Sequence, residues 1–174
     1  MKKELDDALC AQYPLIFKDR NADMQITAMC WGFDCGDGWY NILNVLCIHL
    51  YSDYKEAKRA YDRIKERIDQ PIWDGSDTIV TQAKIDEAKA ELDQETLRIP
   101  VATQVKEKFG GLRFYVSGAS EKHYNYIDFA ESMSIHTCEE CGAFGKLYFD
   151  GWHRTLCDVH AQQEERKPTD DNNH

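Results

Sequence analysis

The chain has 174 residues, of which 43% are hydrophobic and 30% charged, so one globular domain with a small appended module is expected. Its formal net charge of -10 argues against an extended basic surface for nucleic acid. The chain has no apolar run of signal-peptide length at its start and no stretch near the ~20 apolar residues that span a bilayer. We therefore expect a cytoplasmic protein without a membrane partner.

The first third of the chain predicts short helices around a compact loop. A short helix is expected within residues 4–17, and residues 24–35 suit a strand or compact loop because they are rich in β-branched and aromatic side chains. A glycine-rich break follows, and apolar residues then recur with helical spacing over residues 39–50. Asp37 is expected to be the N-cap of that helix or to lie next to it.

Residues 53–97 predict a peripheral pair of helices inserted into the domain. The first should cover residues 53–69, with Asp53 as its N-cap, and the second residues 76–97. The second is rich in good helix formers, but its apolar stripe is thin. We therefore expect a solvated helical hairpin that contributes little to the core.

The pattern changes to period two after residue 100. Two alternating runs flank Gly110-Gly111, and two glycines at such a point predict a β-hairpin with a tight turn. Residues 120–134 then predict another helix, with Tyr124 and Met133 among the side chains facing inward. Residues 1–134 should thus form an α+β domain of helices with a small antiparallel sheet.

Two residue pairs near the C-terminus have the spacing of a metal site. A CxxC pair followed by glycine precedes a Cys-x-x-His pair by fifteen residues, and an Asp-Gly turn between strand-like runs separates them. The four candidate ligands are Cys138, Cys141, Cys157 and His160. This order of knuckle, hairpin and helix predicts a treble-clef-like module over residues 135–166 with one structural Zn²⁺ ion, followed by a disordered tail over 167–174.

A site with four protein ligands leaves no position for substrate, so we assign no catalytic residue and expect no enzyme activity.

Iron remains an alternative metal. A treble-clef-like scaffold also underlies small metal-dependent nucleases, which keep an open metal position and use a histidine base. Residues 138–166 hold six acidic and three basic side chains, and this balance opposes phosphate and favours a protein partner.

An aromatic and acidic loop is a second candidate surface. It contains Trp31, Phe33, Asp34, Asp37 and Trp39 within nine positions. These residues suit an aromatic-walled recognition surface. The alternative, which we favour, is a tight loop that places its aromatic rings in the core and leads into a helix.

The predicted β-hairpin supplies a third candidate surface from Lys106, Lys108, Arg113 and Tyr115. The two lysines should share one strand face because they are two positions apart. They could contact a phosphate or an acidic partner. The alternative is an ordinary solvated strand face.

The remaining cysteines leave a second metal site open. Seven cysteines is an odd number, and without an export signal we expect reduced thiols instead of a disulfide framework. Cys30, Cys35, Cys47 and His49 could bind a further metal, but their spacing matches no common pattern. The alternative is that these cysteines are small buried side chains.

Several segments resemble an uncharacterised family of small phage and prophage proteins. The matching segments are YPLIF, MCWGFDCGDGW, KEKFGGLRFYV, CEECG and TLCDVHA, which are scattered over most of the chain outside residues 53–97. The family carries no settled activity, so the resemblance implies context alone. It implies an accessory phage protein that acts in the bacterial cytoplasm, often against host defence.

Three functions follow as hypotheses. The first is a non-catalytic zinc protein of phage type that binds and inhibits or redirects a host protein, in particular a defence protein. The second is a binder or sponge for a nucleotide-derived small-molecule signal. The third is a nucleic-acid binder or small metal-dependent nuclease, which the acidic composition disfavours.

Overall fold

The computed structural model describes residues 1–67 and 81–166. Several predictions fall outside this part of the chain: the end of the helix expected over 53–69, the first residues of the helix expected over 76–97, and the tail over 167–174. None of the helices within the described residues combines the length and the apolar character needed to cross a membrane.

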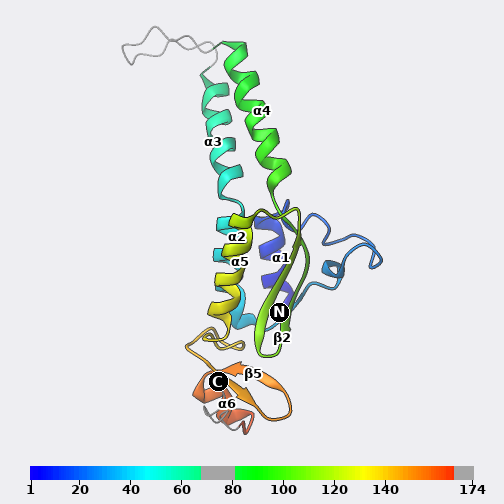
Figure 1. Ribbon diagram of the computed structural model, residues 1–174, viewed down its shortest axis with the longest axis vertical. Helices are drawn as coiled ribbons and strands as arrows, with labels where there is room; N and C mark the ends of the chain where they lie inside the picture. Colours follow the sequence, from blue (N-terminus) through cyan, green and yellow to red (C-terminus); the bar gives the residue numbers. More distant parts are fainter. Residues whose placement is uncertain (68–80, 167–174) are drawn as a thin grey trace.

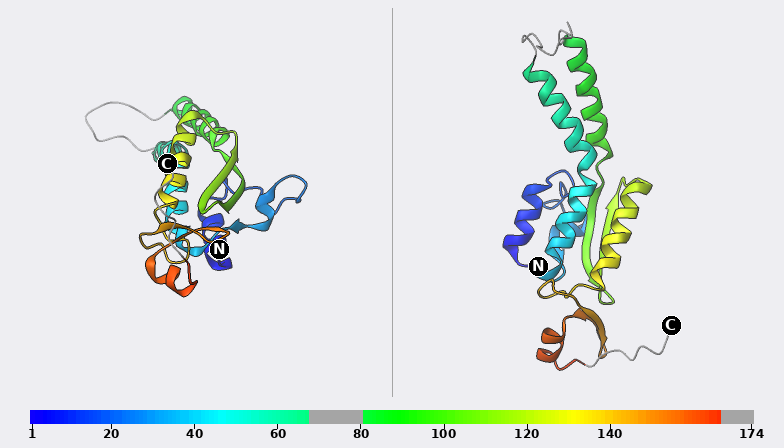
Figure 2. Two further views of the ribbon diagram at one scale, coloured as in Figure 1. Left: turned by 60° about the horizontal axis from the view of Figure 1, so that its bottom comes forward. Right: turned by 90° about the vertical axis from the view of Figure 1, so that its left-hand side faces the viewer.

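The molecule has three parts arranged along one axis (Figure 1). A central body packs three helices against a small sheet, a pair of helices extends from one end of the body, and the C-terminal segment lies at the other end (Figures 1 and 2). The body helices are α1 (Lys3–Gln12), α2 (Tyr40–Leu50) and α5 (Glu121–Ser134), and the extending pair is α3 (Ser52–Glu66) and α4 (Gln82–Arg98).

The sheet of the body has the order β1–β2–β3. Its strands are β1 (Phe33–Asp34), β2 (Val101–Lys108) and β3 (Gly111–Ser117). The α+β class is confirmed, but the sheet is mixed, because β1 runs parallel to β2 while β2 and β3 are antiparallel. A parallel neighbour is possible here because β1 ends at Asp34 and β2 begins only at Val101, which leaves enough chain for the crossover that parallel strands require.

The hairpin between β2 and β3 turns one residue earlier than predicted. Phe109 and Gly110 have φ of 54° and 77°, while Gly111 already pairs with Lys108 in the ladder. Positive φ at both central residues is what a type I′ turn needs. Glycine at position 111 has a steric reason instead, because a Cβ there would lie only 3.2 Å from the Ile135 side chain.

The prediction that Asp53 is a helix N-cap is wrong, because Tyr51 holds that position before α3. The prediction for Asp37 is confirmed in its second form, since Asp37 lies next to Gly36, the N-cap of the 3-10 turn that leads into α2. Asp37 lies in a short 3-10 turn (Asp37–Trp39), and its carboxylate accepts the Lys2 backbone N–H at 2.7 Å and pairs with the Lys2 ammonium at 3.0 Å. Asp53 lies one residue inside α3 and binds the Lys122 ammonium at 2.8 Å. Both carboxylates therefore join separate segments of the chain, which local sequence does not reveal.

The core of the body lies between the helices and the sheet. Its fully buried side chains include Leu9, Tyr13, Trp39, Leu43 and Val105. Burial of such large apolar side chains contributes about 1.5–3 kcal/mol each. The pair of helices α3 and α4, called the arm below, contributes to this core near the body, through Tyr54 and through Ile99 just after α4. The body is therefore stabilised mainly by its own helices and sheet.

Helix α5 protects the outer edge of the sheet. Ser134 Oγ accepts the Leu112 N–H at 2.8 Å, and Glu131 accepts the Phe114 N–H at 2.9 Å. These contacts satisfy donors of β3 that a free edge strand would leave open. Along the same helix Tyr124 and Met133 are 48% and 42% exposed, so their predicted inward orientation is wrong.

Candidate metal centre

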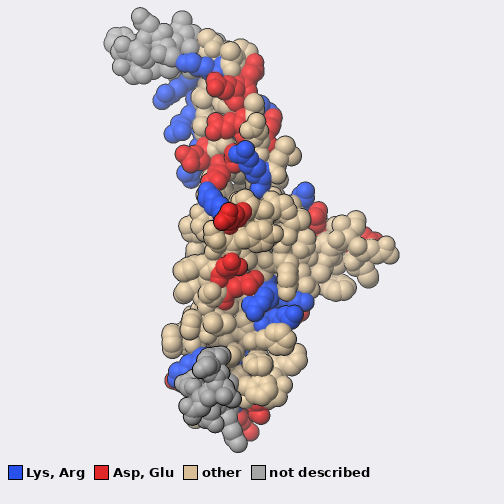
Figure 3. Space-filling view, in the orientation of Figure 1, with Lys and Arg blue, Asp and Glu red and all other residues tan. Residues whose placement is uncertain are grey.

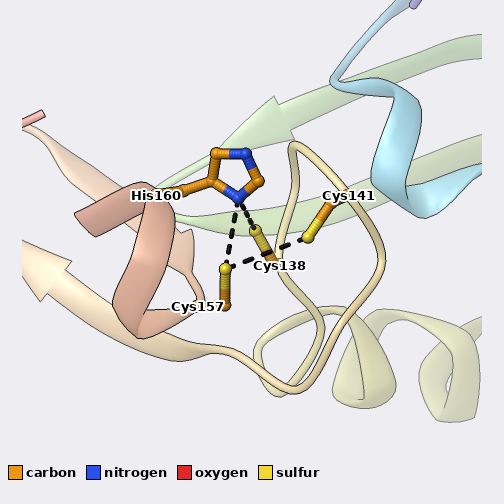
Figure 4. Close-up of side chains that lie close together, drawn as sticks. All are labelled: Cys138, Cys141, Cys157 and His160. Atoms are coloured by element: carbon orange, nitrogen blue, oxygen red, sulfur yellow. Dashed lines mark hydrogen bonds between the residues drawn. The ribbon is translucent and has the colours of Figure 1, made fainter. Parts of the chain in front are cut away.

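The C-terminal segment forms a hairpin and a short helix that bring the four predicted ligands together. Its elements are β4 (Lys146–Phe149), β5 (His153–Leu156) and α6 (Asp158–Gln163). Cys138 and Cys141 lie in the loop that precedes the hairpin, and Cys157 and His160 lie at the start of α6 (Figure 4). The ligand atoms of these four residues all lie within 4.8 Å of one another.

The distances fit a single ion at the centre of a tetrahedron. The Nδ1 atom of His160 lies 3.5 Å from the Cys138 sulfur and 3.2 Å from the Cys157 sulfur, while the sulfurs of Cys141 and Cys157 are 3.9 Å apart (Figure 4). Bond lengths of about 2.3 Å to sulfur and about 2.0 Å to nitrogen place tetrahedral ligands about 3.8 Å (S–S) and about 3.5 Å (S–N) apart. These three separations lie close to the tetrahedral values, and the arrangement of all four ligand atoms suits a single metal ion.

Local backbone geometry positions each half of the cluster. Gly142 has φ of 77° and its N–H donates to the Cys138 carbonyl at 2.8 Å, which closes the knuckle. Only glycine adopts this conformation without strain. Cys157 is the N-cap of α6, so Cys157 and His160 converge over the first turn of that helix.

The start of α6 favours the thiolate form of Cys157. The nearby backbone N–H of His160, together with the neighbouring side chains of the cluster, lowers the pKa of Cys157 to about 6. Thiolate is the form that binds a metal ion. The helix terminus and the cluster thus prepare a ligand that is ionised at neutral pH.

The part of the chain that the structure describes has no second group of three or more such side chains arranged for a metal. Among the described residues, no three of Cys30, Cys35, Cys47 and His49 converge. Cys47 is fully buried, and burial raises the pKa of its thiol well above the usual range. Burial likewise raises the pKa of Cys35 to about 12. These two cysteines are inert core side chains, in line with the alternative reading of the sequence.

The metal knuckle is held against the body by the glycine-rich loop before α2. The N–H of Gly38 donates to the Glu139 carbonyl at 2.7 Å, and the N–H of Gly36 donates to the Glu139 carboxylate at 3.0 Å. The indole N–H of Trp39 donates to the Thr137 carbonyl at 2.8 Å. Sequence reasoning missed this contact, although the Gly-x-Gly-Trp pattern was its signal.

Arg154 ties the module together internally. Its guanidinium contacts the carboxylates of Glu139 at 3.0 Å, Glu140 at 2.5 Å and Glu164 at 3.5 Å. Burial raises the pKa of Glu139, and the nearby charge of Arg154 opposes that effect. Arg154, one of the three basic residues of the module, therefore forms ion pairs within the module and contributes little positive charge to the module surface.

The residues of the predicted aromatic loop do not form one surface. Phe33 and Trp39 are buried, at 4% and 0% exposure, whereas Trp31 is 72% exposed. Asp34 is exposed, and Asp37 is engaged by Lys2. The structure therefore favours the tight loop with core aromatic rings over the recognition surface.

The residues of the predicted hairpin surface do share one face of the sheet. Lys106 stands opposite Arg113 in the ladder, and the Lys106 ammonium lies 5.8 Å from the centre of the Tyr115 ring. Arg113 pairs with Glu131 at 3.4 Å. Lys106 and Lys108 are the members of this set without an ion pair to any described residue.

Comparisons with known proteins give no match: no family model matches the chain, and neither a curated protein nor a solved structure is significantly similar to it. The resemblance to small phage proteins therefore stays a prediction. Function has to be argued from the geometry of the described residues.

Proposed function

We propose that the protein is a non-catalytic binding protein in which a structural zinc ion fixes the C-terminal module and a groove between α2 and α5 takes an apolar helix of a protein partner. The exposed apolar groove is the observation that carries this proposal. The metal centre supports it because four protein ligands leave no coordination position for a substrate.

Zinc is the metal that this set of ligands suits best. Three thiolates and one imidazole disfavour magnesium and calcium, which prefer oxygen ligands. The tetrahedral spacing of Cys138, Cys141, Cys157 and His160 is that of structural zinc sites. When bound, the ion would crosslink the knuckle to α6, and the module would present a rigid surface.

The groove lies along the contact between two body helices and has a volume of 280 Å³. Apolar side chains line nearly all of it, and three of them are well exposed: Phe129 at 68%, Val45 at 51% and Met133 at 42%. Exposed side chains of this size in one continuous groove mark an interaction site more often than a free surface. They would gain about 25 cal/mol for each Å² that a partner covers.

An amphipathic helix is the occupant that fits this groove. The walls are two neighbouring helices, so a third helix can insert an apolar stripe with i, i+3 and i+4 spacing between them. The net charge of -10 favours a partner helix with basic flanks. In this proposal the partner is a bacterial host protein. It is inhibited or redirected because its own amphipathic helix is held in the groove.

The test is a pull-down from bacterial lysate with the full-length protein and two variants. Val45→Asp combined with Phe129→Asp places two charges in the groove and should abolish a stoichiometric partner. Ile48→Asp is the matched control, because Ile48 is 42% exposed on the same helix but does not line the groove. This variant should retain the partner.

Thermal unfolding of all three proteins should agree within a few degrees, since every changed side chain is solvent-exposed. A partner that binds the double variant as well as the unchanged protein would contradict the proposal. The proposal would also be contradicted if sedimentation showed a dimer of the unchanged protein and a monomer of the groove variant. The occupant of the groove would then be a second copy of this chain.

A further inference from the structure

A second cleft lies between the tips of the two hairpins and has a volume of 480 Å³. One wall is the turn of the β2–β3 hairpin of the body, and the other is the turn between β4 and β5 of the metal module. The volume lies within the roughly 300–1,000 Å³ that small-molecule sites occupy. Lys106, Lys108, Phe109, Phe149, Trp152 and His153 line it.

Aromatic rings dominate both walls. Phe109 is 66% exposed, Trp152 63% and Phe149 50%. The His153 ring lies between the two phenylalanines, with its centre 6.1 Å from that of Phe109 and 4.5 Å from that of Phe149. A continuous aromatic array therefore crosses the boundary between body and module, with open ring faces on which a flat ligand can stack.

Positive charge gathers at one side of this array. Lys106 and Lys108 form no ion pair with a described residue, and the Lys108 ammonium lies 5.3 Å from the centre of the Phe109 ring. Lys and Arg side chains are concentrated over the lower part of the β2–β3 hairpin (Figure 3). Glu107 also lines the cleft and adds one negative charge, but its carboxylate accepts the Gly110 N–H at 2.6 Å and forms no ion pair with either lysine. Two lysines that contact aromatic rings and form no ion pair with a described residue stand out in a chain of charge -10.

The two walls are fixed relative to each other. Thr155 Oγ donates to the Gly110 carbonyl at 2.6 Å, and both groups are buried. A Cβ at Gly110 would lie 2.2 Å from the Leu147 side chain, so the hairpin turn fits tightly against β4. The cleft is therefore preformed, and a ligand need not order its walls.

We infer that this cleft binds a nucleotide unit, with the base stacked on Trp152 and the phosphate held by Lys106 and Lys108. Bases stack on aromatic side chains, and lysines hold the backbone phosphates, in proteins that bind single strands. The unit can come from a free nucleotide or from a single-stranded nucleic acid. This site is separate from the α2–α5 groove and does not depend on the proposed function.

The experiment measures binding of two probes to the full-length, metal-loaded protein. AMP is titrated by calorimetry, and a fluorescein-labelled, mixed-sequence DNA single strand of 12 nucleotides is followed by anisotropy. Binding of AMP assigns the cleft to free nucleotides, and binding of the single strand alone assigns it to a polymer. In either case Trp152→Ala should weaken binding about tenfold or more, because one base–aromatic stack is lost.

The two lysines give an independent readout. With two phosphate contacts, single-strand affinity should fall about sevenfold between 50 and 200 mM salt. Lys106→Ala combined with Lys108→Ala should remove most of this salt dependence. For AMP, the same double variant should weaken binding at 50 mM salt.

Matched controls lie outside the cleft. Trp31→Ala removes another exposed tryptophan, and Lys58→Ala combined with Lys89→Ala removes two exposed lysines of the arm, so neither should change affinity by more than about twofold. The inference is overturned if neither probe binds, if a 12-base-pair duplex binds as tightly as the single strand, or if the controls lose as much affinity as the cleft variants.

Discussion

Asp6 is a buried carboxylate that joins three segments of the body. Its two oxygens accept hydrogen bonds from the Arg20 guanidinium, Oδ1 from Nε at 3.1 Å and Oδ2 from Nη2 at 3.0 Å. Oδ2 also accepts the Phe33 N–H at 3.3 Å. Burial acts to raise the pKa of Asp6, but the hydrogen bonds and charge of Arg20 outweigh it and hold the pKa below its usual 3.8. The ionised form therefore stabilises the fold.

Asp6→Asn should lower the free energy of unfolding at pH 7 by about 2–3 kcal/mol, because it removes charge-assisted hydrogen bonds from a buried site. Since the folded pKa is depressed, this stabilisation is complete above about pH 4 and is lost as the pH falls through the folded pKa. Urea unfolding at pH 7 and at pH 3 measures the effect. The difference between variant and unchanged protein should shrink at pH 3.

Asp7→Asn is the control, since Asp7 is exposed and contacts only Lys3 among the described residues. Its effect at pH 7 should stay within about 0.5 kcal/mol. Equal destabilisation by the two substitutions would contradict the role assigned to Asp6.

At the scale of elements, the contact between the glycine-rich loop and the metal knuckle joins the module to the body. A Cβ at Gly38 would lie 2.1 Å from the Cys138 carbonyl oxygen and 2.5 Å from the Gly142 nitrogen. Both neighbours are backbone atoms, so neither can rotate away. The loop and the knuckle must separate before any side chain fits.

Gly38→Ala should therefore destabilise the protein by about 3 kcal/mol or more. Gly118→Ala is the control, because a Cβ there meets nothing within 4 Å and costs only the strain of its φ of 72°. That strain is worth about 1–2 kcal/mol. Urea unfolding of the two variants compares them directly, and a Gly38→Ala protein as stable as the control would show that the contact does not form.

The elements themselves were largely predictable from sequence. Helical spacing over residues 39–50, the period-two runs around Gly110 and the ligand spacing of the module each specify local structure that matches the observed elements. What sequence could not supply is pairing between distant segments. The parallel contact of β1 with β2, the Lys2–Asp37 pair and the docking of Gly38 all join residues far apart in the chain.

At the scale of the whole molecule, the two proposed surfaces occupy different places. The apolar groove follows α2 and α5 of the body, whereas the aromatic cleft lies where the body meets the module. The arm of α3 and α4 extends away from the module (Figures 1 and 2). A partner in the groove and a nucleotide in the cleft have separate sets of lining residues, so the two can be tested independently.

Of the two surfaces, the aromatic cleft depends on the metal module, which has a small core of its own. Among the described residues, its buried cluster consists of Cys138, Tyr148, Leu156 and Ala161, with Cys157 packed against them. A module of this size requires a further crosslink, and a closed metal site supplies one. Metal binding is therefore the claim on which the rigid module and the cleft both rest.

X-ray absorption spectroscopy at the zinc edge, combined with elemental analysis of the full-length protein purified without chelators, tests this claim most directly. We expect one zinc ion per chain, bound by three sulfurs at about 2.3 Å and one nitrogen at about 2.0 Å. An absence of metal, or a shell containing an oxygen from water in place of one of the four side chains, would contradict a closed structural site.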